Sequence, residues 1–135
     1  MTTSLKDGTM IDKMAQFDLP QEIADSEQKK PWQSGQYAKT LFKKHDLRVV
    51  LILMENAAKM KEHHADGTLS VQVLKGQIRF TVHGKPHDLK TGELITLGAS
   101  IRHEVEALQD SAFLLTISWP SNQDLLAMKH RGYGT

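Results

Sequence analysis

The sequence contains no cysteine, and this excludes disulfide bonds, thiolate metal sites and cysteine nucleophiles. It also lacks a long apolar run. The longest, residues 49–54, can form a buried strand but falls far short of the about 18 residues that a membrane helix needs. No charge of one sign dominates, because 17 Lys and Arg stand against 16 Asp and Glu. The N-terminus has no apolar signal segment, so we expect a cytoplasmic protein that binds neither membranes nor nucleic acids.

The 135 residues fit a single domain with a segment added at each end. Residues 1–36 are polar and have little strand pattern, so we expect an arm that packs on the outside, with Pro20 beginning a short helix. Residues 37–120 are the predicted barrel. Residues 121–135 are a predicted C-terminal helix and tail, in which Ser121 caps the helix and Asp124 follows three residues later.

Short strands alternate with turn residues along the predicted barrel. The strand 69–74 places Leu69, Val71 and Val73 on one face and polar side chains on the other. The strand 48–54 is apolar on both faces, as expected for a central strand that is covered on both sides. The other predicted strands are 40–43, 59–64, 78–82, 94–97, 101–107 and 112–118, with a short one at Leu89. About nine strands at this spacing indicate an all-β antiparallel sandwich or barrel.

Histidines on two distant strands are the candidate chemical groups. Residues i and i+2 of a strand face the same side, so Glu62 and His64 share one face and His63 has the other. If the barrel directs Glu62, His64 and His103 inward, two imidazoles and a carboxylate meet in a set that suits Fe(II), Mn or Zn. A one-residue shift brings His63 inward instead. The sequence leaves open which of His63 and His64 faces the interior.

Two motifs with fixed spacing make the sequence resemble the small single-domain cupins of the RmlC-like superfamily. Their second motif, G-x5-P-x-G-x2-H-x3-N, aligns with residues 92–107 with every spacing kept. Gly92 and His103 match it, whereas Gly98, Ser100 and Ala107 replace the proline, the second glycine and the asparagine. The resemblance covers roughly residues 37–118 and implies a double-stranded β-helix, or jelly-roll barrel.

The first cupin motif, G-x5-H-x-H-x4-E-x6-G, aligns with residues 56–76. His64 and Gly76 match it, and residues 73–76 are similar to the family's V-L-x-G. Metal-binding cupins use three histidines and one glutamate, but here Glu62 replaces a histidine and Leu69 replaces the glutamate. The resemblance therefore implies a depleted metal site at His64, His103 and Glu62, or at His63 after the shift. It would hold Fe, Mn, Ni or Zn, or no metal.

Two functions stay open from the sequence. The first is a cupin that binds a small molecule in its barrel and acts as a metal-dependent enzyme of the oxygenase or isomerase type. The second is a metal-free ligand-binding or sensor protein without catalysis. The predicted pocket walls are Leu69, Val71, Val73, Phe80, Val105, Ala107 and Leu114. The resemblance and the apolar strand 49–54 also predict a homodimer.

The basic doublets and the tryptophans are predicted to have structural rather than functional roles. Lys29-Lys30 and Lys43-Lys44 are predicted to lie on solvated faces. Trp32 and Trp119, at the two edges of the barrel region, are predicted to fix the N-terminal arm and the C-terminal helix.

Overall fold

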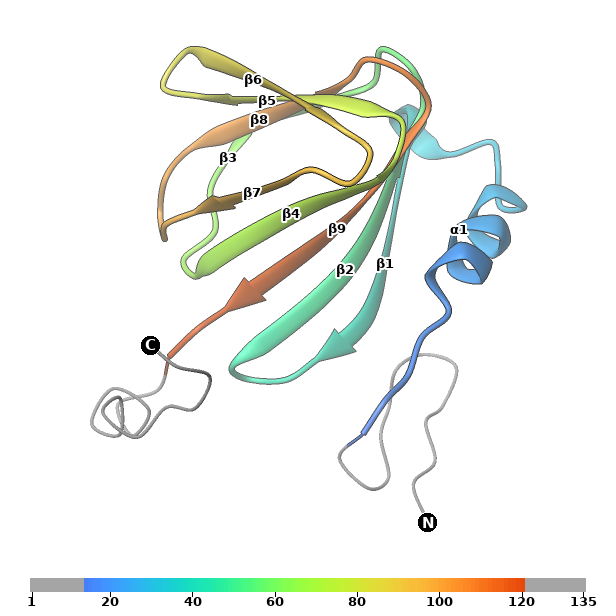
Figure 1. The fold of residues 1–135 in the computed structure, drawn as a ribbon, viewed down its shortest axis with the longest axis horizontal. Helices are drawn as coiled ribbons and strands as arrows, with labels where there is room; N and C mark the ends of the chain where they lie inside the picture. Colours follow the sequence, from blue (N-terminus) through green and yellow to red (C-terminus); the bar gives the residue numbers. More distant parts are fainter. Residues whose placement is uncertain (1–13, 121–135) are drawn as a thin grey trace.

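Two antiparallel sheets face one another in the structure, a computed structural model that describes residues 14–120 (Figure 1). The five-stranded sheet has the order β1-β2-β9-β4-β7 and the four-stranded sheet has the order β3-β8-β5-β6. The elements are α1 (Leu19–Glu27), the 3-10 turn η1 (Gln33–Gly35), β1 (Gln36–Lys43), β2 (Leu47–Met54), β3 (Lys59–His63), β4 (Thr68–Lys75), β5 (Gln77–Val82), β6 (Lys85–Lys90), β7 (Leu94–Leu97), β8 (His103–Ala107) and β9 (Ser111–Ser118). This arrangement confirms the predicted all-β jelly roll.

Alternation along the strands places one apolar core between the sheets. In β4, the inward side chains of Leu69, Val71 and Val73 are all buried in this core. β2 is apolar on both faces because both are covered: Val50 and Ile52 join the core between the sheets, whereas Leu51 joins a second apolar cluster on the outer face. The predicted central strand is therefore confirmed.

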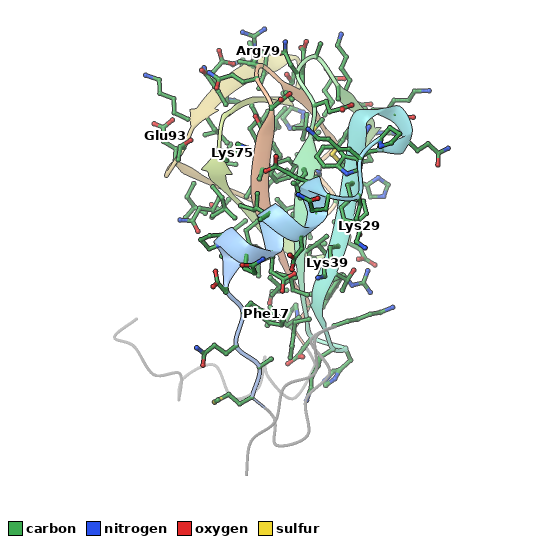
Figure 2. All side chains as sticks on the ribbon, turned by 90° about the vertical axis from the view of Figure 1, so that its right-hand side faces the viewer. Phe17, Lys29, Lys39, Lys75, Arg79 and Glu93 are labelled. Carbon is green, nitrogen blue, oxygen red and sulfur yellow. The ribbon has the colours of Figure 1, made fainter. Side chains whose placement is uncertain are left out.

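Helix α1 covers the outer face of the five-stranded sheet. Asp18 begins the helix by accepting a hydrogen bond from Gln21 N at 3.1 Å, and Pro20 lies in the first turn, where its missing N–H costs nothing. The helix contributes partly buried apolar side chains to the outer cluster that contains Leu51 and Leu53. Figure 2 views the molecule from this side, with α1 in front of the sheet.

Two ion pairs fix α1 to different strands of that sheet. Lys39 of β1 pairs with Glu22, and Lys75 of β4 pairs with Glu27 at 3.1 Å. The Lys39–Glu22 pair is the less exposed, and the hydrogen bond to Glu22 raises the pKa of Lys39. The helix thus bridges strands that lie on opposite sides of β2 and β9.

The turn between β4 and β5 depends on Gly76. Its φ of +78° lies in the left-handed region, and a Cβ built there would overlap Asp110 O and Ser111 Oγ. Ser111 is buried, and its Oγ accepts a hydrogen bond from Gln77 N at 3.0 Å. Gly76 thus allows the β4–β5 turn to pack directly against the start of β9.

One strand begins earlier than its sequence suggests, and two predicted segments fall on residues that the structure does not describe. The sequence Gly84-Lys85-Pro86 is typical of a turn, but residues 85 and 86 belong to β6, which tolerates Pro86 because it is at the edge of its sheet. The predicted C-terminal helix at 121–135 and the first 13 residues of the arm lie outside the described residues. Across residues 14–120, no helix has the length and apolar character needed to cross a membrane.

Candidate functional site

His63 and His103 meet at one end of the four-stranded sheet, where β3 ends and β8 begins. They are directly opposite across the antiparallel pair, and their ring centroids lie 4.3 Å apart in an edge-to-face arrangement. Phe80 of β5 stacks on the His103 ring at a centroid distance of 5.0 Å. His103 is only 4% exposed, so its imidazole is enclosed by aromatic and imidazole rings from two neighbouring strands.

A β-bulge determines which residue of β3 faces His103. Met60 is opposite Val105, so a regular ladder would place Glu62 opposite His103. The register instead shifts between Met60 and His63, which puts one extra residue on β3 and brings His63 to the inner position. The structure therefore adopts the shifted arrangement that the sequence left open.

The other two candidate ligands lie on the outer side of β3. The side chain of Glu62 is 58% exposed. It forms an ion pair of 3.2 Å with Arg102, whose side chain is 65% exposed. His64 is also exposed. The expected convergence of Glu62, His64 and His103 is thus not what the structure shows, because the bulge reverses the faces at this end of β3.

The hydrogen bonds of the two inner rings define their tautomers. His63 Nδ1 lies 2.7 Å from Lys61 O, and His103 Nδ1 lies 3.0 Å from Ile101 O. A carbonyl oxygen only accepts, so each Nδ1 carries the hydrogen and the Nε2 lone pair of a neutral ring is left for another partner. Burial lowers the pKa of His103 below its ordinary value of 6.5, and the nearby His63 and His64 lower it further against the Ile101 hydrogen bond. His103 is therefore neutral at pH 7.

The donor set does not fit a cupin metal site of three histidines and one glutamate. Leu69 occupies the position of the family glutamate and is buried in the apolar core. Glu62 and His64 face outward, so only His63 and His103 remain together. Among residues 14–120, no group of three or more His, Cys, Asp or Glu side chains is arranged to hold a metal ion.

Most of the predicted pocket walls are parts of the packed core. Six of them join one cluster between the sheets, namely Leu69, Val71, Val73, Phe80, Val105 and Ala107. Leu114 differs, because it packs against the outer cluster beneath α1. The physical reason is its register: Leu114 is opposite Leu51, whose side chain also faces outward.

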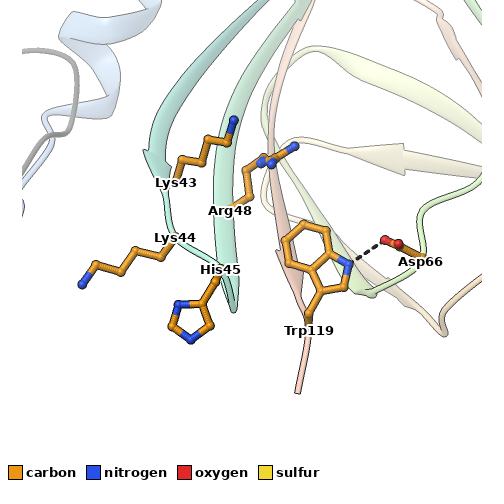
Figure 3. Close-up of a pocket in the computed structure, with 6 residues that line it drawn as sticks. All are labelled: Lys43, Lys44, His45, Arg48, Asp66 and Trp119. Atoms are coloured by element: carbon orange, nitrogen blue, oxygen red, sulfur yellow. Dashed lines mark hydrogen bonds between the residues drawn. The ribbon is translucent and has the colours of Figure 1, made fainter. Parts of the chain in front are cut away.

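A second site, which the sequence interpretation missed, lies at the turn between β1 and β2. We call it the basic hollow: an open depression of about 790 Å³ lined by Lys43, Lys44, His45, Arg48, Asp66 and Trp119 (Figure 3). Lys43-Lys44 was predicted to be a solvated face and Trp119 a contact for the C-terminal helix. The predicted hairpin already contained the signal, because a turn over residues 44–47 places Lys43 opposite Arg48.

Two facing antiparallel sheets with an imidazole pair at one end define a small jelly-roll barrel protein. A family model described as "Cupin domain" matches residues 49–119, which is more than half of the chain. The chain belongs to the cupin-domain family, as the two sequence motifs predicted. No curated protein matches it.

Solved structures with the same fold come from several bacteria. A conserved protein of unknown function from Streptococcus pyogenes is 22% identical with a TM-score of 0.66, over 82% of this chain and 92% of that one. KdgF from a Halomonas species is 19% identical with a TM-score of 0.62, over 70% and 87%. A cupin 2 conserved barrel domain protein from Leptotrichia buccalis is 28% identical with a TM-score of 0.63, over 70% and 46%. These likenesses show the fold.

Proposed function

We propose that this cupin binds a small molecule without a metal ion, and that the neutral imidazole of His103 accepts a hydrogen bond from that ligand. The observation that carries the proposal is the tautomer of a buried ring: Nδ1 is bonded to Ile101 O, so Nε2 is the acceptor. No hydrogen bond from a residue in 14–120 reaches this Nε2. The Nε2 atom is not among the buried side-chain atoms that lack a partner, so it is accessible to a ligand donor although most of the ring is buried.

His63 and Phe80 give this acceptor its orientation. Phe80 stacks on the His103 ring and His63 contacts its edge, so the imidazole is held on two sides. A fixed acceptor beside apolar core residues favours a compact, partly apolar ligand that carries a hydroxyl or amide group. The same neutral Nε2 could take a proton from a bound acid.

A thermal-shift screen tests the proposal with a defined panel of uncharged sugars, alcohols and phenols. A ligand at one hundred times its Kd stabilises the folded protein by about 2.7 kcal/mol, which is a readily measured increase in Tm. We expect compounds that stabilise the wild-type chain to have no effect on His103→Phe. They should keep their effect on the control His64→Gln, whose side chain is exposed.

Metal binding is the measurement that separates this proposal from its alternative. The protein is refolded with Fe(II), Mn(II), Ni(II) or Zn(II), and each sample is passed through a desalting column before elemental analysis. The proposal expects no stoichiometric metal and the same ligand-induced Tm shift with and without a chelator. One metal ion per chain that is lost in His63→Gln and His103→Gln would refute it and favour a metal-dependent enzyme.

We also propose that the chain forms a homodimer in the cytoplasm. Within residues 14–120, β1 is at the edge of its sheet and pairs only with β2, so no described strand uses its second row of backbone groups. The apolar strand that suggested a dimer is itself covered within one chain, on both faces. Light scattering at high micromolar concentration should give twice the monomer mass, and cell fractionation tests the location.

A further inference from the structure

Arg48 is a partly buried cation with an unused donor at the edge of the basic hollow. Its Nε is buried and has no hydrogen-bond partner. No acidic residue in 14–120 forms an ion pair with it, and its guanidinium lies over the Trp119 ring at 5.5 Å. A buried donor without an acceptor costs free energy, more so when it is charged. The Nη atoms of the same guanidinium are not among the buried atoms, and they are the donors that an acceptor from outside can reach.

The backbone register adds a second, independent argument. Lys43 and Arg48 are direct partners across β1 and β2, and Lys44 follows in the turn. Two cations that lie directly opposite on neighbouring strands repel one another and destabilise the pair. An oxyanion between them removes this cost, because it attracts both. The Lys43–Arg48 pair therefore destabilises the hairpin by itself, and it is favourable where an anion binds between the two cations.

The negative charge of the hollow is already engaged. Asp66 is the one carboxylate among the six lining residues, and its Oδ1 accepts a hydrogen bond from Trp119 Nε1 at 2.6 Å. The backbone N–H of Trp119 also donates to Asp46 O at 3.0 Å, so the residue is fixed to two turns, through its indole to one and through its backbone to the other. Asp66 makes no ion pair with Arg48 (Figure 3). The hollow is thus lined by three lysine and arginine side chains and by a single carboxylate, which orients Trp119.

Gly67 allows the turn after β3 to lie close to the Trp119 indole. A Cβ at Gly67 would lie 2.9 Å from Trp119 Nε1 and 2.7 Å from Ser118 O, closer than a side chain can be accommodated. Glycine at this position lets the turn after β3 reach the indole. The side chain that stacks with Arg48 is therefore held in place by hydrogen bonds and by close backbone packing.

We propose that the basic hollow binds a small molecule through a carboxylate or phosphate group. Arg48 supplies a planar pair of donors for the oxyanion, Lys43 and Lys44 supply charge, and Trp119 supplies an apolar surface for the rest of the ligand. The open volume of about 790 Å³ accommodates a ligand larger than the oxyanion itself. The hollow does not include His63 or His103, so this proposal is independent of the proposed function.

The test is an NMR titration of the ¹⁵N-labelled full-length chain. Sodium phosphate and sodium malonate are added separately at constant ionic strength, with sodium chloride as the balancing salt. The indole N–H of Trp119 and the Nε–H of Arg48 are the reporters. Trp32 is an internal control, because its indole N–H donates to Ser26 O near α1, away from the hollow. We expect saturable shifts at Trp119 and Arg48 and none at Trp32.

Matched variants separate specific binding from general attraction to a basic surface. Arg48→Gln should weaken the binding at least about tenfold, because it removes a charge-assisted pair of hydrogen bonds. Arg48→Lys keeps the charge and should still lose affinity, since it lacks the planar fork. Lys43→Gln should weaken binding less. Lys85→Gln removes a charge at the start of β6 and should match the wild-type chain.

The titration distinguishes saturable binding of an oxyanion from unspecific attraction to the basic surface. Saturation by phosphate alone, by malonate alone or by both supports the proposal and identifies the group that the hollow prefers. Shifts that grow without saturation, that chloride reproduces, or that are equal in Arg48→Gln and Lys85→Gln would overturn it. The dispersion of each spectrum verifies that the variant is folded. Should Arg48→Gln fail to fold, Lys43→Gln against Lys85→Gln decides the question.

Discussion

Replacing Gly76 by alanine should destabilise the protein more than the same change at Gly84. Both glycines have left-handed backbone conformations, with φ values of +78° and +74°. The conformational cost of a Cβ is therefore similar at both positions, about 1–2 kcal/mol. At Gly84 nothing lies within 4 Å of the added carbon, whereas at Gly76 it would overlap Asp110 O and Ser111 Oγ and lie 2.9 Å from Ser111 Cα.

The overlap at Gly76 is with backbone and with a buried serine, so it cannot be relieved by rotating a flexible side chain. Forcing an extra methyl group into a packed region costs about 1–3 kcal/mol. We therefore expect Gly84→Ala to lower the free energy of unfolding by about 1–2 kcal/mol. Gly76→Ala should lower it by roughly 2–5 kcal/mol in total.

Urea unfolding followed by circular dichroism measures both variants against the wild-type chain. The difference between them isolates the steric contribution, because the backbone conformation and the chemical change are matched. Equal losses of stability in the two variants would refute the close packing of the β4–β5 turn against β9. So would a Gly76→Ala variant that is as stable as the wild-type chain.

Other predictions address the imidazole pair, a second close approach and the core. His103 has a lowered pKa in the folded state, so the unfolded chain binds more protons near that pKa. The free energy of unfolding should therefore fall as the pH drops below about 6.5, by at most about 1.4 kcal/mol per pH unit. His103→Phe should remove this pH dependence in urea unfolding from pH 5 to 8, whereas the exposed His87→Gln should retain it. Gly67→Ala should destabilise the protein by about 1–3 kcal/mol. Gly98→Ala should have little effect, because the atom nearest to the added Cβ would be Ile101 Cδ1 at 3.6 Å. Differential scanning calorimetry measures both variants. Phe113→Ala should cost about 3–5 kcal/mol in the same urea assay, because Phe113 is fully enclosed in the core; a loss below 1 kcal/mol would mean that the core is looser than the structure indicates.

The fold could be predicted because its signals are local and repeat along the chain. The alternation at Leu69, Val71 and Val73 gives the inward face of β4 directly, and the apolar stretch in β2 predicts a strand that is covered twice. Spacing between glycines and histidines then identified the family. Each of these signals depends on two-residue periodicity or on turn residues, which one sequence contains in full.

The site was harder to predict because it depends on one bulge. The periodicity of β3 placed Glu62 and His64 on the same face as each other, which is correct, but it could not say that the extra residue would direct that face outward. β3 is short and has polar residues on both faces, so no apolar pattern specifies its register. His63 was therefore an open alternative. Its partner depends on pairing with β8, some 40 residues later, which the sequence does not encode locally.

The basic hollow shows a different limit. Lys43, Arg48 and Trp119 carry ordinary signals when they are considered one at a time. Their meaning comes from two turns that meet at the end of β9, through the contacts of Trp119 with Asp46 and Asp66. A pairwise check of charges across the predicted hairpin would have identified Lys43 and Arg48, because that check needs only the position of the turn.

The order of the strands has a consequence for how the chain folds. β9 lies between β2 and β4, and β8 lies between β3 and β5, so each sheet receives an interior strand from the last third of the described chain. Until those strands are in place, β2 and β4 have no common partner, and the apolar faces of both half-sheets are exposed. Pairings between residues so distant in sequence form slowly. During synthesis, the first two thirds of the barrel must therefore wait for its late strands, and in that interval α1 covers only the outer face of the sheet, not the face that becomes the core.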